Sequence, residues 1–143
     1  AKGDKSDYLA TMRSGYLVFK QSPVIGIGTG NFRNMCPDII DLSASLPCHP
    51  HPHNFYIQLL AETGVIGFMF GIIFLGSIIQ TCYKSSRRNR ENVVVATAWV
   101  IPLAFFWPIA PAADFFGQWN NIFMWSAISL ALAFGNLQKI RPG

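Results

Sequence analysis

The chain has 143 residues, of which 51% are hydrophobic and only 13% are charged. Soluble domains usually carry about 25% charged residues, so this composition argues against an ordinary soluble domain and indicates a membrane protein. The net charge is +4, but the one basic run, at 84–90, is short and has a simpler explanation in membrane topology, so the sequence gives no support for nucleic-acid binding.

The first part of the chain is hydrophilic and is expected to form a structured region outside the membrane. The spacing of four apolar residues predicts a short helix over 8–19: Leu9, Met12, Tyr16 and Phe19. Pro23 should end this helix, because the residue before a proline leaves the helical region. The glycine-rich run 26–31 then predicts a tight turn.

An irregular segment and a second short helix complete this region. Residues 37–52 contain four prolines, and Asn54 is a good N-cap for a helix over 55–62, which Gly64 should break. Two cysteines flank the irregular segment. An oxidising compartment would permit a disulfide between them, but the sequence leaves open whether they are bonded: Cys36 and Cys48.

The rest of the chain is expected to cross the membrane three times. Uncharged stretches cover 65–82, 93–113 and 122–137. A bilayer core about 30 Å thick needs roughly 20 apolar residues in a helix. We therefore predict an all-α, polytopic membrane protein, with a periplasmic loop over 1–62 and a transmembrane region over 63–143. The predicted spans are about 65–83, 93–112 and 121–137, and the second should be kinked or end early because three prolines recur in it: Pro102, Pro108 and Pro111.

The distribution of basic residues predicts the orientation. Short loops rich in Lys and Arg stay in the cytoplasm. The basic loop at 84–92 and the C-terminal tail, with Lys139 and Arg141, are therefore expected inside, and 1–62 and 114–121 outside. No signal-like segment opens the chain, so we expect it to be the C-terminal piece of a longer multi-pass protein.

A cluster of three histidines and a cysteine offers donor atoms for zinc or copper: Cys48, His49, His51 and His53. The alternating prolines favour an extended backbone that would splay these side chains apart, and no second pair of ligands exists elsewhere. We therefore expect no metal site, although a metal-sensing membrane protein or a transporter remains the non-enzymatic alternative.

His53 is the candidate for chemistry, because it directly precedes the predicted helix that follows Asn54. A helix N-terminus offers N–H groups and a partial positive charge, which suit a phosphate ligand. An imidazole at that point can act as a base near neutral pH, and Asn54 beside it can contact the substrate. The alternative is that His53 only caps the helix or binds a backbone carbonyl.

Other polar residues carry weaker signals. Arg13 lies on the polar side of the helix over 8–19, where a guanidinium could form a forked contact with a diphosphate, but a solvated surface arginine is the preferred interpretation from these residues alone. Glu62 could orient His53, but an interfacial carboxylate is the preferred interpretation, and Asp114 has the same ambiguity. The glycine run matches neither the dinucleotide-binding fingerprint nor the P-loop, so it carries no nucleotide site.

Three blocks of sequence resemble the bacterial O-antigen ligase family, which shares a domain with O-antigen polymerases. The first is His53-Asn54 followed by nine residues, Gly64, two residues and Gly67-Phe68. The second is Arg13 followed by the proline-and-glycine turn over 23–32, and the third is the aromatic turn over 115–120 ahead of Trp125. The resemblance covers roughly residues 8–135.

The resemblance implies a multi-pass glycosyltransferase of the bacterial inner membrane that moves a glycan from undecaprenyl diphosphate to lipid A–core on the periplasmic face, with neither a metal nor another cofactor. By the same resemblance, His53 would take the proton of the acceptor hydroxyl, and Arg13 would hold the diphosphate. An O-antigen polymerase or a protein O-oligosaccharyltransferase of the same family is the alternative. The family's further upstream arginine and most of its membrane helices are missing from this stretch, so we expect the fragment to be inactive alone.

Overall fold

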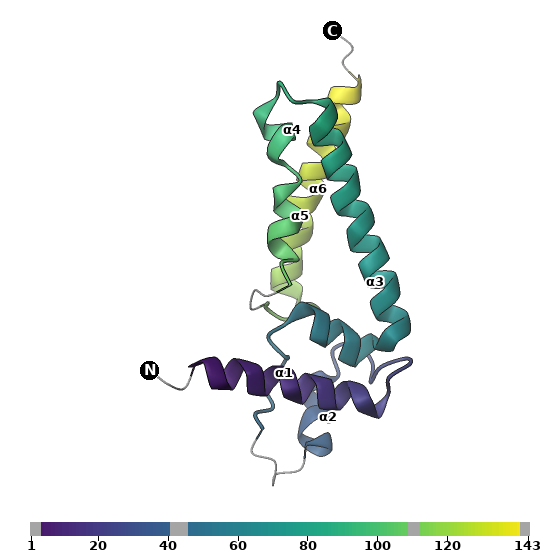
Figure 1. The fold of residues 1–143 in the computed structure, drawn as a ribbon, viewed down its shortest axis with the longest axis vertical. Coiled ribbons are helices and arrows are strands. Elements are labelled where there is room, and N and C mark those ends of the chain that lie inside the picture. Colours follow the sequence, from purple (N-terminus) through teal and green to yellow (C-terminus); the bar gives the residue numbers. More distant parts are fainter. Residues whose placement is uncertain (1–3, 41–45, 109–111, 141–143) are drawn as a thin grey trace. The chain divides into compact units, whose positions relative to one another are not determined.

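The computed structural model describes residues 4–40, 46–108 and 112–140, and within them every regular element is a helix (Figure 1). This confirms the all-α class. The chain divides into two compact units, one of residues 1–71 and 108–118 and the other of 72–107 and 119–143. The helices, in chain order, are α1 (Asp4–Gln21), α2 (Phe32–Ile39), α3 (Phe55–Arg88), α4 (Val93–Thr97), α5 (Val100–Phe105) and α6 (Gln118–Ile140).

Helix α1 is longer than predicted and buries a different face. It ends at Gln21, just before Ser22-Pro23, as the proline predicts. Leu9 and Tyr16, two of the apolar residues that suggested the helix, are exposed, whereas Ser14 is fully buried and donates its hydroxyl to the Pro47 carbonyl at 2.8 Å. The face of α1 that carries small residues such as Ser14 therefore lies against the irregular segment.

A compact apolar core holds α1, α2 and the start of α3 together. It consists of five buried residues, Val18, Phe32, Cys36, Ile40 and Ala61. Cys36 is bonded to Cys48, so a disulfide joins α2 to the segment that carries the three histidines. The pairing that the sequence left open is therefore made.

The glycine-rich run docks onto the break in α3. Gly64 has φ 64° and ψ −171°, which interrupts the helix and frees backbone groups on both sides. The carbonyls of Ala61 and Glu62 accept from the backbone N–H groups of residues 27 and 28, at 3.1 and 2.9 Å. In return, Val65 and Ile66 donate to the carbonyls of residues 23 and 24, at 2.9 and 3.2 Å. Four backbone groups next to the break thus find partners in the glycine-rich run and the residues before it.

The predicted tight turn is confirmed by the backbone of this run. Three glycines have positive φ, a region that side chains rarely occupy: Gly26, Gly28 and Gly30. The turn lets the run reverse direction and present its N–H groups to α3 and to Glu62.

Helix α3, whose residues belong partly to the first unit and partly to the second, meets the requirements of a membrane span. Among the described residues, only α3 is long and apolar enough to cross a bilayer, with a mean hydropathy of 2.1 over its most apolar window. It contains the first predicted span, 65–83. The other two spans stay predictions. Helices α4 and α5 are short, and for α6 the structure describes side chains only as far as residue 134.

The second predicted span is divided, as its prolines suggest. Helix α4 ends at Thr97 and α5 begins at Val100, with a turn at Ala98 and Trp99 between them. Pro102 cannot donate to the Ala98 carbonyl four residues earlier, and Ile101 donates to it instead, at 3.2 Å. Helix α5 then ends at Phe105, so the helix stops short of the predicted end at 112.

Candidate active site

The three histidine rings lie together at the start of α3. The ring centroid of His53 is 4.4 Å from that of His51 and 5.2 Å from that of His49. Our prediction that the prolines would splay these side chains is therefore wrong. The physical reason is the left-handed backbone of His53, with φ 54°, which folds the segment back on itself just before the helix.

Asn54 is the N-cap that the sequence predicts. Its side-chain oxygen accepts from the N–H groups of Tyr56 and Ile57, both at 3.1 Å, and its amide nitrogen donates to the Pro108 carbonyl at 3.0 Å. The residue is buried. The cap therefore occupies two of the helix N–H groups that we expected to be available to a phosphate. Asn54 also attaches Pro108 to the start of the helix.

A second contact fixes the same distant segment beside the histidines. The backbone N–H of Ala112 donates to the carbonyl of His53 at 2.9 Å. Together with the Asn54 contact, this places the segment 112–116 over the N-terminal turns of α3.

A buried polar stripe runs along the first two turns of α3. Asn54, Gln58 and Glu62 are spaced four residues apart, so they share one face of the helix, and each is at most 4% exposed. Gln58 donates to the Asp114 carboxylate at 2.6 Å and accepts from the Phe115 N–H at 3.0 Å. Sequence reasoning missed Gln58. The four-residue spacing was the available signal, but its partners lie 56 and 57 residues away.

Glu62 is a buried anchor of the glycine-rich run, which corrects its interpretation as an interfacial carboxylate. One oxygen accepts from the Gly30 N–H and the other from the Phe32 N–H, at 2.5 and 3.3 Å. Burial raises the pKa of Glu62, and the hydrogen bonds from Gly30, Gln58 and Phe32, in decreasing order of effect, oppose the rise. The carboxylate thus fixes the start of α2 onto α3.

Asp114 joins the stripe to the histidines. Its carboxylate also accepts from the Phe116 N–H at 3.0 Å and forms an ion pair with Arg33 at 3.5 Å. Burial lowers the pKa of His51, and the neighbouring charge of His53 lowers it further, while the Asp114 charge and a backbone hydrogen bond at Ala112 act in the opposite direction. The neutral form of the His51 imidazole is therefore favoured.

The predicted pair of site residues differs in its surroundings. His53 is half-buried among the other two rings, whereas Arg13 is exposed on α1. In the described residues, the guanidinium that connects to the histidines is that of Arg33, through Asp114. The contacts described above therefore link His53 to Asp114 and Arg33 and do not include Arg13.

The cysteine of the cluster is not available as a metal-binding thiolate. Cys48 is held in the disulfide with Cys36. Among residues 4–40, 46–108 and 112–140, no group of three or more His, Cys, Asp or Glu side chains is arranged to hold a metal ion. The arrangement places three imidazole rings next to the buried hydrogen-bonding groups at the start of α3.

The sequence around the histidines matches a known protein family. The sequence profile of the O-antigen ligase family matches residues 1–72, which is half of the chain and includes α1, the glycine-rich run, the histidines and Gly64. The chain belongs to the O-antigen ligase family. The family consists of membrane-associated, glycosyltransferase-like enzymes. The aromatic turn over 115–120, the third block of the resemblance, lies outside the match.

Neither the curated proteins nor the solved structures contain a match to this chain. The family assignment therefore rests on the profile match and on the motif blocks that fall within it.

Proposed function

We propose that this chain carries the catalytic part of a glycosyltransferase that moves a glycan from undecaprenyl diphosphate to a sugar hydroxyl of lipid A–core. The observation that carries this proposal is the O-antigen ligase match over residues 1–72, which contains the histidine cluster. The acceptor hydroxyl needs a base and the diphosphate needs a cation. The chain offers an imidazole and two arginines, Arg13 and Arg33, in the same compact unit.

In the proposed step, the His53 imidazole takes the proton of the acceptor hydroxyl as its oxygen attacks the anomeric carbon of the glycan. The bond from that carbon to the diphosphate oxygen breaks, and undecaprenyl diphosphate leaves with the electron pair. A positioned general base typically contributes about 10²–10⁴-fold to the rate. Arg13 holds the diphosphate and stabilises the charge that it gains, and Asn54 keeps its proposed role in contacting the substrate in addition to capping α3.

The membrane placement follows from α3 and from the charge distribution. We propose that α3 crosses the bacterial inner membrane, with residues 1–62 on the periplasmic side and 84–92 in the cytoplasm. The disulfide between Cys36 and Cys48 supports the periplasmic assignment, because disulfides persist in oxidising compartments. In this orientation, His53 lies near the outer leaflet, where the lipid-linked donor is found.

The first test compares two neighbouring histidines in the intact protein. His53→Ala should abolish transfer, because no other group is proposed to take the proton, whereas His51→Ala should retain it. The measurement is the amount of O-chain attached to lipid A–core, seen on a lipopolysaccharide gel of a ligase-deficient strain that expresses each variant. Equal loss in both variants would contradict a single base. Failure of the wild-type protein to restore attachment in this strain, together with restored chain length in a polymerase-deficient strain, would favour a polymerase instead.

The second test concerns the cation that holds the diphosphate. Arg13→Lys should reduce transfer strongly, because an ammonium cannot replace the two-pronged contact of a guanidinium with phosphate oxygens. Arg33→Lys is the matched comparison, since Arg33 is already paired with Asp114. Wild-type transfer by the Arg13 variant together with loss in the Arg33 variant would move the diphosphate role from Arg13 to Arg33.

A further inference from the structure

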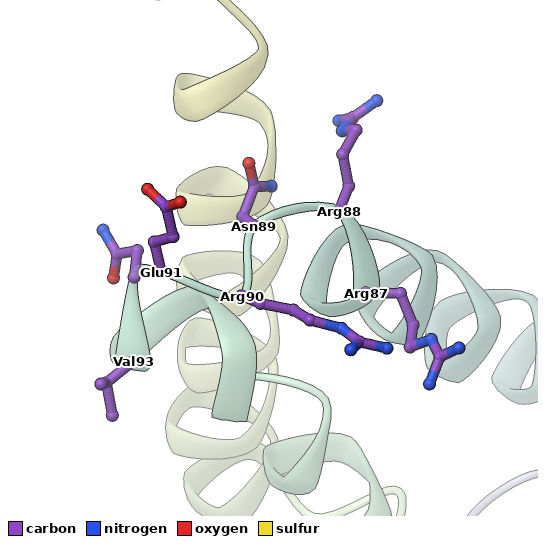
Figure 2. Close-up of a pocket in the computed structure, with 7 residues that line it drawn as sticks. Arg87, Arg88, Asn89, Arg90, Glu91 and Val93 are labelled. Atoms are coloured by element: carbon purple, nitrogen blue, oxygen red, sulfur yellow. The ribbon is translucent and has the colours of Figure 1, made fainter.

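A basic cleft lies at the turn between α3 and α4, in the second compact unit. Figure 2 shows the seven residues that line it, 87–93. Three of these residues are exposed arginines: Arg87, Arg88 and Arg90. Glu91 is the one acidic residue in the lining.

Hydrogen bonds that do not involve the arginines hold the backbone of this turn. The Asn92 side chain accepts from the N–H groups of Val94 and Val95, at 3.1 and 3.3 Å. The Asn89 side chain donates to the Ser85 carbonyl at 3.0 Å, and the hydroxyl of Ser86 donates to the Ala96 carbonyl. The arginine side chains are therefore not needed to form the turn and are available for another role.

Two of the arginines share one side of the turn. In Figure 2 the guanidinium groups of Arg87 and Arg90 lie on the same side, whereas Arg88 extends to the opposite side. The Glu91 carboxylate also points away from them. In the part of the chain that the structure describes, no carboxylate forms an ion pair with Arg87 or Arg90. Two like charges held near each other repel, and an anion between them removes that repulsion.

The chemistry of the pair defines the anion. Guanidinium groups bind phosphate oxygens through paired, charge-assisted hydrogen bonds. Helix α3 is the apolar helix that is suited to cross the membrane, and the cleft begins at its last residues. The end of such a helix lies at the depth of the lipid headgroups.

We propose that Arg87 and Arg90 form a binding site for the phosphate of an anionic phospholipid headgroup, on the side of the membrane where α3 ends. This rests on the membrane placement proposed above and not on the transfer reaction. The site holds this end of α3 at the membrane surface. Basic clusters next to membrane helices are attracted to the anionic lipids of the cytoplasmic leaflet, which agrees with the proposed orientation.

The experiment uses the intact protein in a neutral detergent, titrated with short-chain phosphatidylglycerol, phosphatidylcholine or inorganic phosphate while its thermal midpoint is followed. Phosphatidylglycerol should raise the midpoint and phosphatidylcholine should not. Arg87→Gln combined with Arg90→Gln should weaken the apparent affinity for phosphatidylglycerol by about tenfold or more, because several charge-assisted hydrogen bonds are lost. Lys84→Gln combined with Arg88→Gln removes the same charge and should leave that affinity almost unchanged.

Three outcomes would overturn the proposal. Equal weakening in both double variants would show diffuse attraction and no site. An equal response to inorganic phosphate would show a free-anion site, and no response of the wild type to phosphatidylglycerol would show no lipid site. If the glutamine variant does not fold, Arg87→Lys with Arg90→Lys, which keeps the charge but loses the forked contact, provides the same comparison. Transfer activity measured in parallel separates this proposal from the proposed function, because either can fail alone.

Discussion

The two compact units of this chain are stabilised by different kinds of interaction. In the first unit, polar contacts join residues that are far apart in the sequence, such as Gln58 with Asp114 and Glu62 with Gly30. In the second unit, the hydroxyls of α3 and α4 mostly donate to carbonyls three or four residues earlier, as Thr81 does to Ser77. The first unit therefore depends on tertiary hydrogen bonds. The second unit depends on hydrogen bonds within its helices, which carry large exposed apolar side chains such as Ile73.

This difference indicates where single substitutions should be costly. A buried polar contact between distant segments has a unique geometry, and losing one partner leaves the other buried and unpaired. An apolar helix that faces lipid keeps its own backbone hydrogen bonds whatever side chain it carries. We therefore expect substitutions in the first unit to cost more than matched substitutions in the second.

A pair of glycine substitutions tests this comparison with the largest expected effect. Gly64 has positive φ, and a Cβ placed there would collide with the backbone carbonyl of Val24, whereas a Cβ at Gly76 meets nothing within 4 Å. Gly64→Ala should destabilise the intact protein by at least about 3 kcal/mol, because it combines backbone strain with loss of the docked glycine-rich run. Gly76→Ala should be neutral or stabilising by up to about 1 kcal/mol. Thermal midpoints in detergent measure both.

The control for that pair lies in the same run. Gly30 also has positive φ, but a Cβ there has open space around it, so Gly30→Ala tests the strain without the collision. It should cost clearly less than Gly64→Ala. If the two cost the same, the contact between the run and α3 contributes little, and the distinction between the units weakens.

The disulfide gives the next largest effect. Cys36→Ser should destabilise the intact protein by about 3 kcal/mol, because a bridge spanning 12 residues restricts the unfolded chain and also joins α2 to the histidine segment. Cys82→Ala, at the free buried cysteine of the second unit, should cost less. The measurement is the thermal midpoint of each variant with and without dithiothreitol. A reductant effect on Cys36→Ser as large as that on the wild type would contradict the assignment.

Local features of this fold were predictable from sequence, and for identifiable reasons. Pro23, Asn54 and Gly64 each act on the backbone within a few residues, so the end of α1, the cap of α3 and its break could be placed correctly. The first apolar stretch is long enough to be recognised without its neighbours. These predictions required no knowledge of which helices pack against one another.

The site was less predictable, because its contacts join residues that are 30 to 57 positions apart in the sequence. Nothing near Glu62 in sequence indicates that Gly30 and Phe32 come to it, so its burial was missed, and Gln58 was missed for the same reason. The histidine rings were expected to separate because an extended proline-rich backbone was assumed. The left-handed conformation at His53, held where its carbonyl accepts from Ala112, is set by the distant segment.

The smallest expected effect concerns pH and the first unit alone. The pKa of His51 is lowered below 6.5, first by burial and then by the charge of His53, with Asp114 opposing the shift and His49 adding a small part to it. Because the folded state disfavours the charged imidazole, the stability contributed by His51 is fully present above pH 6.5 and is lost as pH falls through its lowered pKa. His51→Gln should therefore make the thermal midpoint of the intact protein fall less between pH 7 and about pH 5 than in the wild type. A steeper fall in the variant would mean that Asp114 dominates and that the folded state favours the charged ring. In that case Asp114 would form an ion pair with a charged His51, and His53 would lie next to a fixed positive charge.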